Sequence, residues 1–189
     1  MRLNLGCGRS RRNGWVNVDC TEVPGVTDLV VDLDGPALAS ALEPDCVEES
    51  SGVHVIEHLA NPLQFMEALW AVTAPGGTAT FEVPYGTSDD AWEDPTHRRP
   101  YFMQSWEYFG QPTYFRADYG YRGDWRVLQV ALAVDADRWD GVPPDVVQAA
   151  VRSERNVVRA MHATLEAVKP IREPNRDLRE PTPVRFVLV

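Results

Sequence analysis

The stretch Leu3-Asn4-Leu5-Gly6-Cys7-Gly8 is the part of the sequence that indicates the fold. Its first three residues predict a short strand that stops at glycine. Glycines at positions 6 and 8 allow a tight turn and let the backbone approach a ligand closely. Such a turn is typical of nucleotide-binding α/β enzymes, but an ordinary strand-ending turn has the same pattern. The segments that follow this turn therefore decide between the two interpretations.

Seven segments show the apolar alternation of strands between turn residues. They are Leu3–Leu5, Trp15–Asp19, Leu29–Asp32, Ser51–Val55, Thr78–Val83, Val127–Val134 and Val184–Val189. One helix is predicted from Asn61-Pro62 to Pro75, and a longer one over residues 144–168, where apolar residues recur at helical spacing.

This order predicts a single α/β domain over residues 1–189, with a Rossmann-like, seven-stranded, mostly parallel sheet whose faces are covered. We expect the last strand to be antiparallel. The first helix should be shortened or missing, because only six residues separate Gly8 from Trp15.

Two acids stand where the second and third predicted strands end. Asp19 ends Trp15–Asp19, and Asp32 ends Leu29–Asp32. In open parallel sheets, ligands bind beyond the carboxyl ends of the strands. There Asp19 can accept the two hydroxyls of a ribose, and Asp32 would lie beside the base. A glycine turn and two acids at successive strand ends thus predict a nucleoside-binding site.

The same residues resemble a known family. Leu3–Gly8 followed by Gly14–Asp19 is similar to the class I S-adenosylmethionine-dependent methyltransferases, above all to a small subgroup that opens with LNLGCG and GWxNVD. The likeness continues through Val31–Leu33, Val55–Leu59, Pro75–Gly77 and Asp94–Tyr101, and so covers about residues 3 to 109. It implies that the chain binds S-adenosylmethionine and transfers its methyl group.

The resemblance also implies which residues bind the cofactor. Gly6, Cys7 and Gly8 would line its methionine and ribose part, Asp19 its ribose hydroxyls, Asp32 and Leu33 its adenine, and Gly52, Val53 and His54 its sulfonium side. Asn4 stands where the family has an acid, so the methionine amino group loses one anionic neighbour. We expect no counterpart before Leu3 of the N-terminal helices that often cover the substrate in this fold.

The string His54-Val55-Ile56-Glu57-His58 allows more than one interpretation. It fits the H-x-x-E-H pattern of inverted zinc peptidases, but Ser50-Ser51-Gly52 before it favour a strand end over the long helix that this chemistry needs. With His54 in place of an acid, it also resembles the metal string of ubiquinone-pathway and small-RNA O-methyltransferases, so a divalent cation remains an alternative. The simplest interpretation is that Glu57 and His58 form a hydrogen-bonding pair at a helix start, and we assign no metal.

Residues 85–125 hold twelve of the eighteen aromatic residues of the chain. The segment follows the fifth predicted strand, beside the expected site of methyl transfer. Aromatic side chains pack a long loop well, so most of them would form a local core, while others would make the wall of a substrate lid. Within the segment, His97 is our first choice for the general base of hydroxyl methylation and Asp94 would orient it; His58 is the second choice.

The composition narrows the choice of substrate. A net charge of −10 opposes binding to a phosphate backbone, so we expect no nucleic-acid partner. The Asn/Asp-Pro-Pro-aromatic signature of amino-directed DNA methylation is missing, since Asn61-Pro62 is followed by Leu63. A small-molecule or sugar hydroxyl is therefore the expected methyl acceptor. The alternative function is that of a non-catalytic binding or scaffolding module that kept the fold.

Location and assembly follow from weaker signals. An apolar stretch of about 18 residues is lacking, and so is a signal peptide, so we expect no membrane partner. Three cysteines without CxxC spacing fit a reducing compartment, and we expect a cytoplasmic protein. The predicted helix over residues 144–168 offers a surface through which two copies could form a homodimer.

Overall fold

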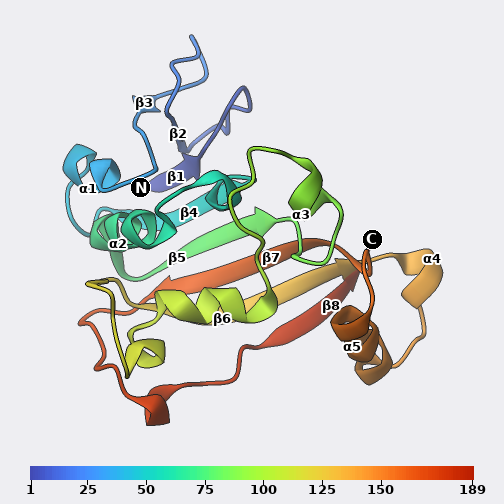
Figure 1. Cartoon of the computed structure of the whole chain (residues 1–189). Coiled ribbons are helices and arrows are strands. Elements are labelled where there is room, and N and C mark those ends of the chain that lie inside the picture. The colour runs from blue at the N-terminus through green and yellow to red at the C-terminus, as the bar shows by residue number, and fades with distance from the viewer.

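The computed structural model describes all residues from 1 to 189, and its strands form one eight-stranded sheet (Figure 1). The spatial order of the strands is β3-β2-β1-β4-β5-β7-β6-β8. In chain order they are β1 (Arg2–Leu5), β2 (Val16–Asp19), β3 (Leu29–Val30), β4 (Val47–Val53), β5 (Thr73–Val83), β6 (Trp125–Val134), β7 (Val158–Ala167) and β8 (Val184–Leu188).

The sheet is mostly parallel, as the sequence predicted. β7 alone runs against its neighbours β5 and β6, whereas β8 pairs with β6 in parallel. The expectation of seven strands with an antiparallel last strand therefore needs correction in both details. The antiparallel strand is the seventh, and an eighth follows it at the edge of the sheet.

The long helix predicted over residues 144–168 is half right. Helix α5 spans Pro144–Ser153, Asn156 then adopts a left-handed φ of 57°, and β7 follows. Along β7 every second residue from Met161 to Ala167 is buried, which is the period of a strand. The helix proposed as a homodimer surface is therefore shorter than predicted, because the second part of its range forms β7 inside the sheet.

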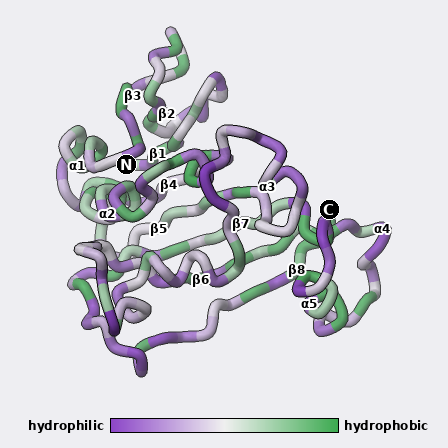
Figure 2. The backbone as a smooth tube through the Cα atoms, in the orientation of Figure 1, coloured by the Kyte–Doolittle hydropathy of each residue, from purple (hydrophilic) through white to green (hydrophobic).

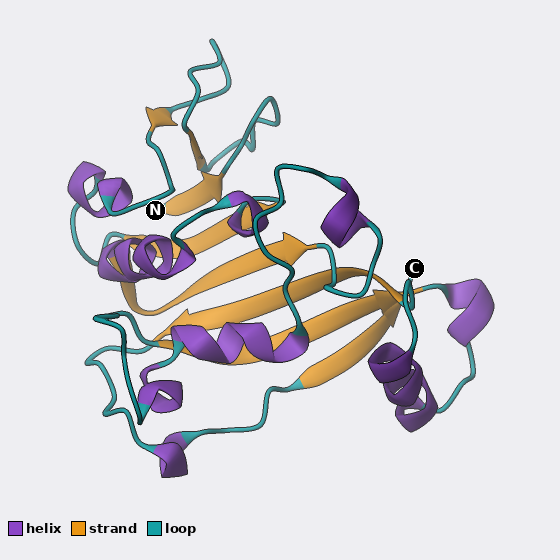
Figure 3. Ribbon diagram, viewed as in Figure 1, coloured by secondary structure: helices purple, strands orange, loops and turns teal.

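The remaining helices are short apart from α2. They are α1 (Ala37–Ala41), η1 (Ile56–His58), α2 (Pro62–Val72), α3 (Asp90–Glu93), η2 (Met103–Phe109), η3 (Gln111–Tyr114), α4 (Ala136–Trp139) and η4 (Arg176–Leu178). Pro62 begins α2 as predicted, since proline suits the first turn of a helix. Figure 3 draws the β1–β2 and β2–β3 connections as loops without a helix, so the first helix is missing altogether.

Much of the hydrophobic core lies between the sheet and the helices α2 and η2. Trp106 of η2 stacks on Phe81 of β5, with ring centroids 5.6 Å apart, and Figure 1 shows α2 and η2 lying across the strands. The opposite side chains of β5 and β7 are polar and only partly buried: Thr78, Thr80, Glu82, His162, Thr164 and Glu166. We call them the polar face. The sequence predicted a sheet with covered faces, whereas these side chains are only partly buried.

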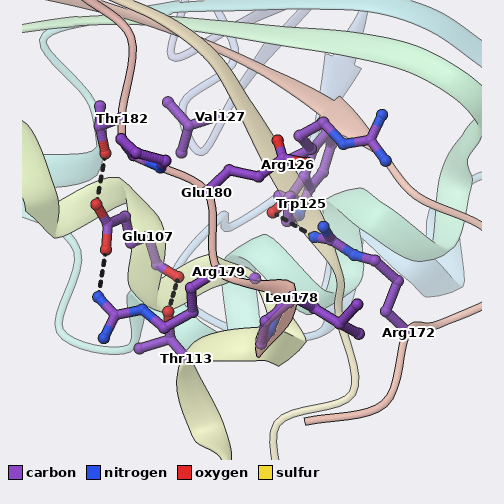
Figure 4. A pocket seen from close by; sticks show the side chains of 13 residues that line it. Glu107, Thr113, Trp125, Arg126, Val127, Arg172, Leu178, Arg179, Glu180 and Thr182 are labelled. Atoms are coloured by element: carbon purple, nitrogen blue, oxygen red, sulfur yellow. Dashed lines mark hydrogen bonds and ion pairs between the residues drawn. The ribbon is translucent and has the colours of Figure 1, made fainter. Parts of the chain in front are cut away.

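A polar segment, residues 168–183, joins β7 to β8 along the bottom of the sheet, and we call it the connector (Figure 2). Figure 4 shows how Glu107 of η2 holds it beside a small cavity of about 50 Å³. The Glu107 carboxylate accepts hydrogen bonds from Arg179 Nη2 at 2.7 Å and from Thr182 Oγ1 at 2.6 Å. These hydrogen bonds hold the connector against residues 85–125, which we call the aromatic segment. No helix of the chain has the length and apolar character that crossing a membrane requires.

Candidate functional site

The first strands end around one cavity of about 250 Å³, which we call the strand-end cavity. Its lining comes from the residues that follow β1 to β4: Gly6, Asp19, Cys20, Asp32, Leu33, His54, Val55, His58 and Leu59. Because β1, β2, β3 and β4 are parallel neighbours, their carboxyl ends share one edge of the sheet. The cavity therefore lies where this class of sheet binds its ligands.

Asp19 fastens the glycine turn to the end of β2. Its Oδ2 accepts a hydrogen bond from the backbone N–H of Gly8 at 2.8 Å, and its Oδ1 accepts one from Thr21 at 2.9 Å. A carboxylate oxygen has about two acceptor positions, so each oxygen keeps one for a ligand. Asp19 thus shapes the turn and still presents acceptors to the strand-end cavity.

Gly6 is the position at which the turn tolerates no side chain. Its φ of 60° is left-handed, and a Cβ there would lie 2.3 Å from Cγ2 of Val55. Real Cβ atoms do not approach other atoms so closely, and L-residues are strained at this φ. Glycine at this position lets the turn after β1 contact the segment after β4, which closes one side of the cavity.

A hydrogen-bond network around Asn17 connects the β1–β2 loop with the segment before β3. Asn17 of β2 is fully buried, and both its backbone N–H and its Nδ2 donate to Oδ2 of Asp28, at 2.9 and 2.7 Å. Asn4 Nδ2 donates to Asn17 Oδ1 at 2.9 Å, and Arg11 Nη1 donates to Asp28 Oδ1 at 2.8 Å. The hydrogen bonds from Asn17, followed by that from Arg11, lower the pKa of Asp28 to about 2.

Sequence reasoning missed Asn17 and Asp28. A signal existed, because Asn17 interrupts the apolar residues of a predicted strand, and a buried amide needs partners. The partner could not be named, since Asp28 lies before a different strand.

Asp34 anchors the start of α2 near the third strand end. Its carboxylate accepts hydrogen bonds from the backbone N–H groups of Ala60 at 3.0 Å and Asn61 at 2.7 Å. Burial raises the pKa of Asp34, but these hydrogen bonds and the positive charge of Arg98 together hold the pKa below its usual value. The neighbouring Asp32 is exposed and accepts only from Asp34 N at 2.9 Å, which leaves it available at the cavity.

A cluster of Glu57, His58 and His97 lies beside the strand-end cavity. One potential metal-ligand atom from each of the three side chains lies within 4.8 Å of those of the other two. The rings of His58 and His97 meet edge to face with centroids 4.7 Å apart. Glu57 is buried, and its Oε1 lies 3.1 Å from Nδ1 of His54. The string that carries Glu57 and His58 forms a strand end and the short helix η1, so it does not provide the long helix of a zinc peptidase.

Comparisons with known proteins agree with the topology. No protein-family model matches the sequence, and no curated protein sequence matches it significantly. Among solved structures, the chain is similar to an S-adenosylmethionine-dependent methyltransferase from Archaeoglobus fulgidus, with a TM-score of 0.57 and 16% identity over 87% of this chain and 85% of that one. The chain has the class I S-adenosylmethionine-dependent methyltransferase fold.

Two further structures delimit what this fold implies. A methyltransferase from Thermotoga maritima, described as a possible histamine N-methyltransferase, has a TM-score of 0.54 and 9% identity over 89% of this chain and 81% of its own. The cyclase SpnF has a TM-score of 0.52 and 13% identity over 88% of this chain and 74% of its own. A cyclase among the matches means that this level of likeness shows the fold and leaves the reaction to the site.

The structure brings together some of the residues expected to bind the cofactor. Gly6, Asp19, Asp32, Leu33 and His54 line the strand-end cavity. The other expected residues lie around it without lining it: Asn4, Cys7, Gly8, Gly52 and Val53. Cys20, Val55 and Leu59 also line the cavity, although the sequence analysis did not assign them to the binding site.

Each expected residue outside the lining has a structural role or position of its own. The Asn4 side chain donates a hydrogen bond to the Asn17 side chain, and the backbone N–H of Gly8 donates one to Asp19. Burial raises the pKa of the Cys7 thiol, which disfavours the reactive thiolate. A Cβ on Gly52 would lie 3.1 Å from the Phe81 ring, so its glycine suits core packing, whereas Val53 is exposed.

The expected pair of Asp94 and His97 is not hydrogen-bonded. Asp94 Oδ2 lies 3.9 Å from His97 Nε2, and Asp94 Oδ1 accepts instead from the Thr96 backbone N–H at 2.7 Å and hydroxyl at 2.6 Å. These hydrogen bonds lower the pKa of Asp94. The His97 side chain is only 8% exposed and does not line the cavity, whereas His58 does. Of the two histidines expected as general base, only His58 lines the strand-end cavity.

The aromatic segment packs on the sheet and does not wall the strand-end cavity. Seven of its aromatic residues are buried, and none of its twelve lines that cavity: Tyr85, Tyr101, Trp106, Phe109, Tyr114, Tyr121 and Trp125 are the buried ones. Burial raises the pKa of Tyr114 to about 12. A separate cavity of about 290 Å³ lies between this segment and the start of α2, lined among others by Leu63, Arg99, Tyr108 and Tyr119.

Proposed function

We propose that the chain binds S-adenosylmethionine in the strand-end cavity and transfers its methyl group to a hydroxyl of a small molecule or sugar. The observation that carries the proposal is the meeting of Gly6, Asp19 and Asp32 around one cavity in a methyltransferase fold. Asp19 would bind the ribose hydroxyls with its remaining acceptor positions. Leu33 and Val55 would supply apolar walls for the adenine base of the cofactor.

The volume of the cavity suits a ligand that stays partly exposed to solvent. Its volume of about 250 Å³ lies just below the roughly 300–1,000 Å³ of typical ligand pockets. S-adenosylmethionine would supply an electrophilic methyl group there. The chain would mainly align the acceptor, because methyl transfer is a displacement in which geometry sets most of the rate.

The acceptor hydroxyl would meet histidines at the edge of the cavity. His54 and His58 both line it. His54 Nδ1 lies 3.1 Å from the Glu57 carboxylate, which can only accept, so Nε2 of His54 is the nitrogen that can receive a proton. The net charge of −10 favours a small acceptor over a nucleic acid.

Calorimetry with S-adenosylhomocysteine tests the binding step. We expect binding by the wild-type chain and at least about tenfold weaker binding by Asp19→Asn, since a hydrogen bond to a charged group is worth about 1.5–3 kcal/mol. Asparagine keeps one oxygen for the turn, which makes it a milder change than alanine. Asp145→Asn is the matched control, because Asp145 is exposed on α5 at the other end of the sheet (Figure 1). An absence of binding at millimolar S-adenosylhomocysteine would contradict the proposal.

The second candidate function is that of a non-catalytic binding module. The observation in its favour is Asn4, whose amide is used in hydrogen bonds to Ser10 and Asn17, so the turn offers no acid to the methionine amino group. Mass spectrometry of reactions with a panel of hydroxyl acceptors separates the two functions. Formation of methylated product supports the enzyme, and ligand binding without product from any acceptor supports the module.

A further inference from the structure

The hydrogen bonds around Glu57, His58 and His97 leave each of these side chains with an unused lone pair. Nucleoside binding does not require this arrangement. The Thr96 hydroxyl donates to Asp94 Oδ1 at 2.6 Å, so towards His58 Nδ1, 2.9 Å away, it can only accept. His58 Nδ1 therefore carries the proton, and its Nε2 carries a lone pair.

His97 has the same proton arrangement. Its Nδ1 lies 3.3 Å from the backbone carbonyl oxygen of Ala91, which can only accept a hydrogen bond. Nδ1 is therefore the donor, and Nε2 of His97 carries a lone pair as well. Both imidazoles are held by a hydrogen bond from Nδ1, and proteins commonly orient metal-binding histidines by a hydrogen bond from the ring nitrogen that does not bind the metal.

The third side chain is a buried carboxylate with an unused oxygen. Glu57 is 2% exposed, and while its Oε1 bonds His54, its Oε2 has no hydrogen-bond partner. Burying a charged oxygen without a partner is costly, and each such group in a folded protein calls for an explanation. One potential ligand atom from each of Glu57, His58 and His97 lies within 4.8 Å of the other two, and a cation between them would supply the missing partner.

We propose that Glu57, His58 and His97 bind a divalent first-row transition-metal ion. Two imidazoles and one carboxylate form a ligand set used for zinc and for non-haem iron, with open positions for water or substrate. Metal–ligand bonds of about 2.0–2.2 Å place tetrahedral ligands roughly 3.4 Å apart. One ligand atom from each side chain lies within 4.8 Å of the other two, so these atoms would move closer by up to about 1.4 Å when the ion binds.

The ligand set differs from the one that the sequence left open. His54 points its Nδ1 at Glu57 and belongs to the surroundings of the site, while His97 joins from the loop after α3. The ion would adjoin the strand-end cavity through His58, and His54 would remain the imidazole available there. Metal binding itself does not depend on the proposed methyl transfer.

Metal titration of the tag-free, chelator-treated full chain tests the proposal. We expect one equivalent of Zn²⁺ by calorimetry and one of Co²⁺ by its visible absorption. Glu57→Gln and His97→Gln should each abolish stoichiometric binding at about 100 µM metal. Thr96→Val keeps all three ligands and removes the contact to His58 Nδ1, and should weaken binding by about 10–100-fold.

His162→Gln is the matched control. It removes a histidine on the polar face whose Nδ1 lies 3.5 Å from Glu82, outside the cluster, and should bind metal like the wild type. Zn²⁺ should raise the melting temperature of the wild-type chain and of His162→Gln but not of Glu57→Gln, whose own melting curve reports whether it folds. Absence of stoichiometric binding by the wild type, or full binding by Glu57→Gln, would overturn the proposal. S-adenosylhomocysteine binding by the chelator-treated chain is measured in parallel, so failure of the metal site and failure of the proposed function are distinct results.

Discussion

Arg172 binds both carboxylate oxygens of Asp124, with Nε 2.9 Å from Oδ2 and Nη2 2.7 Å from Oδ1. The Asp124 side chain is fully buried, and the Arg172 side chain is 19% exposed. Asp124 also accepts from the backbone of Gln111 at 3.0 Å. This pair fixes the connector after β7 to the start of β6, and Figure 4 shows Arg172 reaching back toward Trp125.

Replacing Arg172 should destabilise the fold strongly. We expect Arg172→Met to lower the free energy of unfolding by about 3–5 kcal/mol, because it leaves the Asp124 charge buried and unpaired. Urea unfolding followed by fluorescence measures the loss. Arg155→Met is the control, since Arg155 pairs with Asp89 at the surface, with side chains 70% and 45% exposed, and should cost about 0–1 kcal/mol. Equal losses in the two variants would contradict the assignment.

The Asn17–Asp28 contact should make stability depend on acid pH. The pKa of Asp28 is lowered from 3.8 to about 2, so its contribution is complete above the unfolded value and is lost as the pH falls from about 4 to about 2. Asp28→Asn should therefore melt below the wild type at pH 7, and the difference should shrink over that acid range. Thermal unfolding at a series of pH values measures it. A difference that stays constant down to pH 2 counts against the contact.

Gly6 should tolerate alanine much less well than Gly25 does. Both glycines have a left-handed φ, 60° and 76°, but a Cβ on Gly25 meets nothing within 4 Å, whereas on Gly6 it meets Val55. Gly25→Ala should cost about 1–2 kcal/mol from backbone strain alone. Gly6→Ala should cost roughly 1–3 kcal/mol more from overpacking. Chemical denaturation compares the two, and an equal cost would mean that Val55 moves away freely.

Trp106 should behave as part of the core and not as part of a mobile lid. Its ring stacks between Phe81 and Tyr101, with centroids 5.6 and 5.2 Å away, and it is fully buried. Trp106→Ala should cost about 3–5 kcal/mol. Tyr119→Ala, at a residue that is 82% exposed, should stay within about 0.5 kcal/mol of the wild type. Fast hydrogen exchange throughout residues 103–109 in the wild type would instead indicate a lid.

Short local patterns determined much of the fold. The alternation in β2 and the second half of β5, the glycine turn after β1 and the proline that begins α2 depend on neighbours in sequence. Asp19 and Asp32 could be placed at the sheet edge for the same reason, since a strand end is visible in sequence and parallel strands share an edge. The missing first helix was also readable, because the loop between Gly8 and Trp15 leaves little room for one.

Tertiary contacts decided the rest. Met161 and Leu165 fit a helical stripe and a strand equally well, and β7 forms because it hydrogen-bonds to β5 on one side and β6 on the other. His97 joins Glu57 and His58 only because the loop after α3 folds back to η1, where Arg98 N donates to Glu57 O at 2.8 Å. The sequence by itself determined which short segments form strands and turns, since steric and hydrophobic periodicity are local. Only the tertiary structure decided which distant polar groups meet, because burial and pairing depend on the whole packed chain.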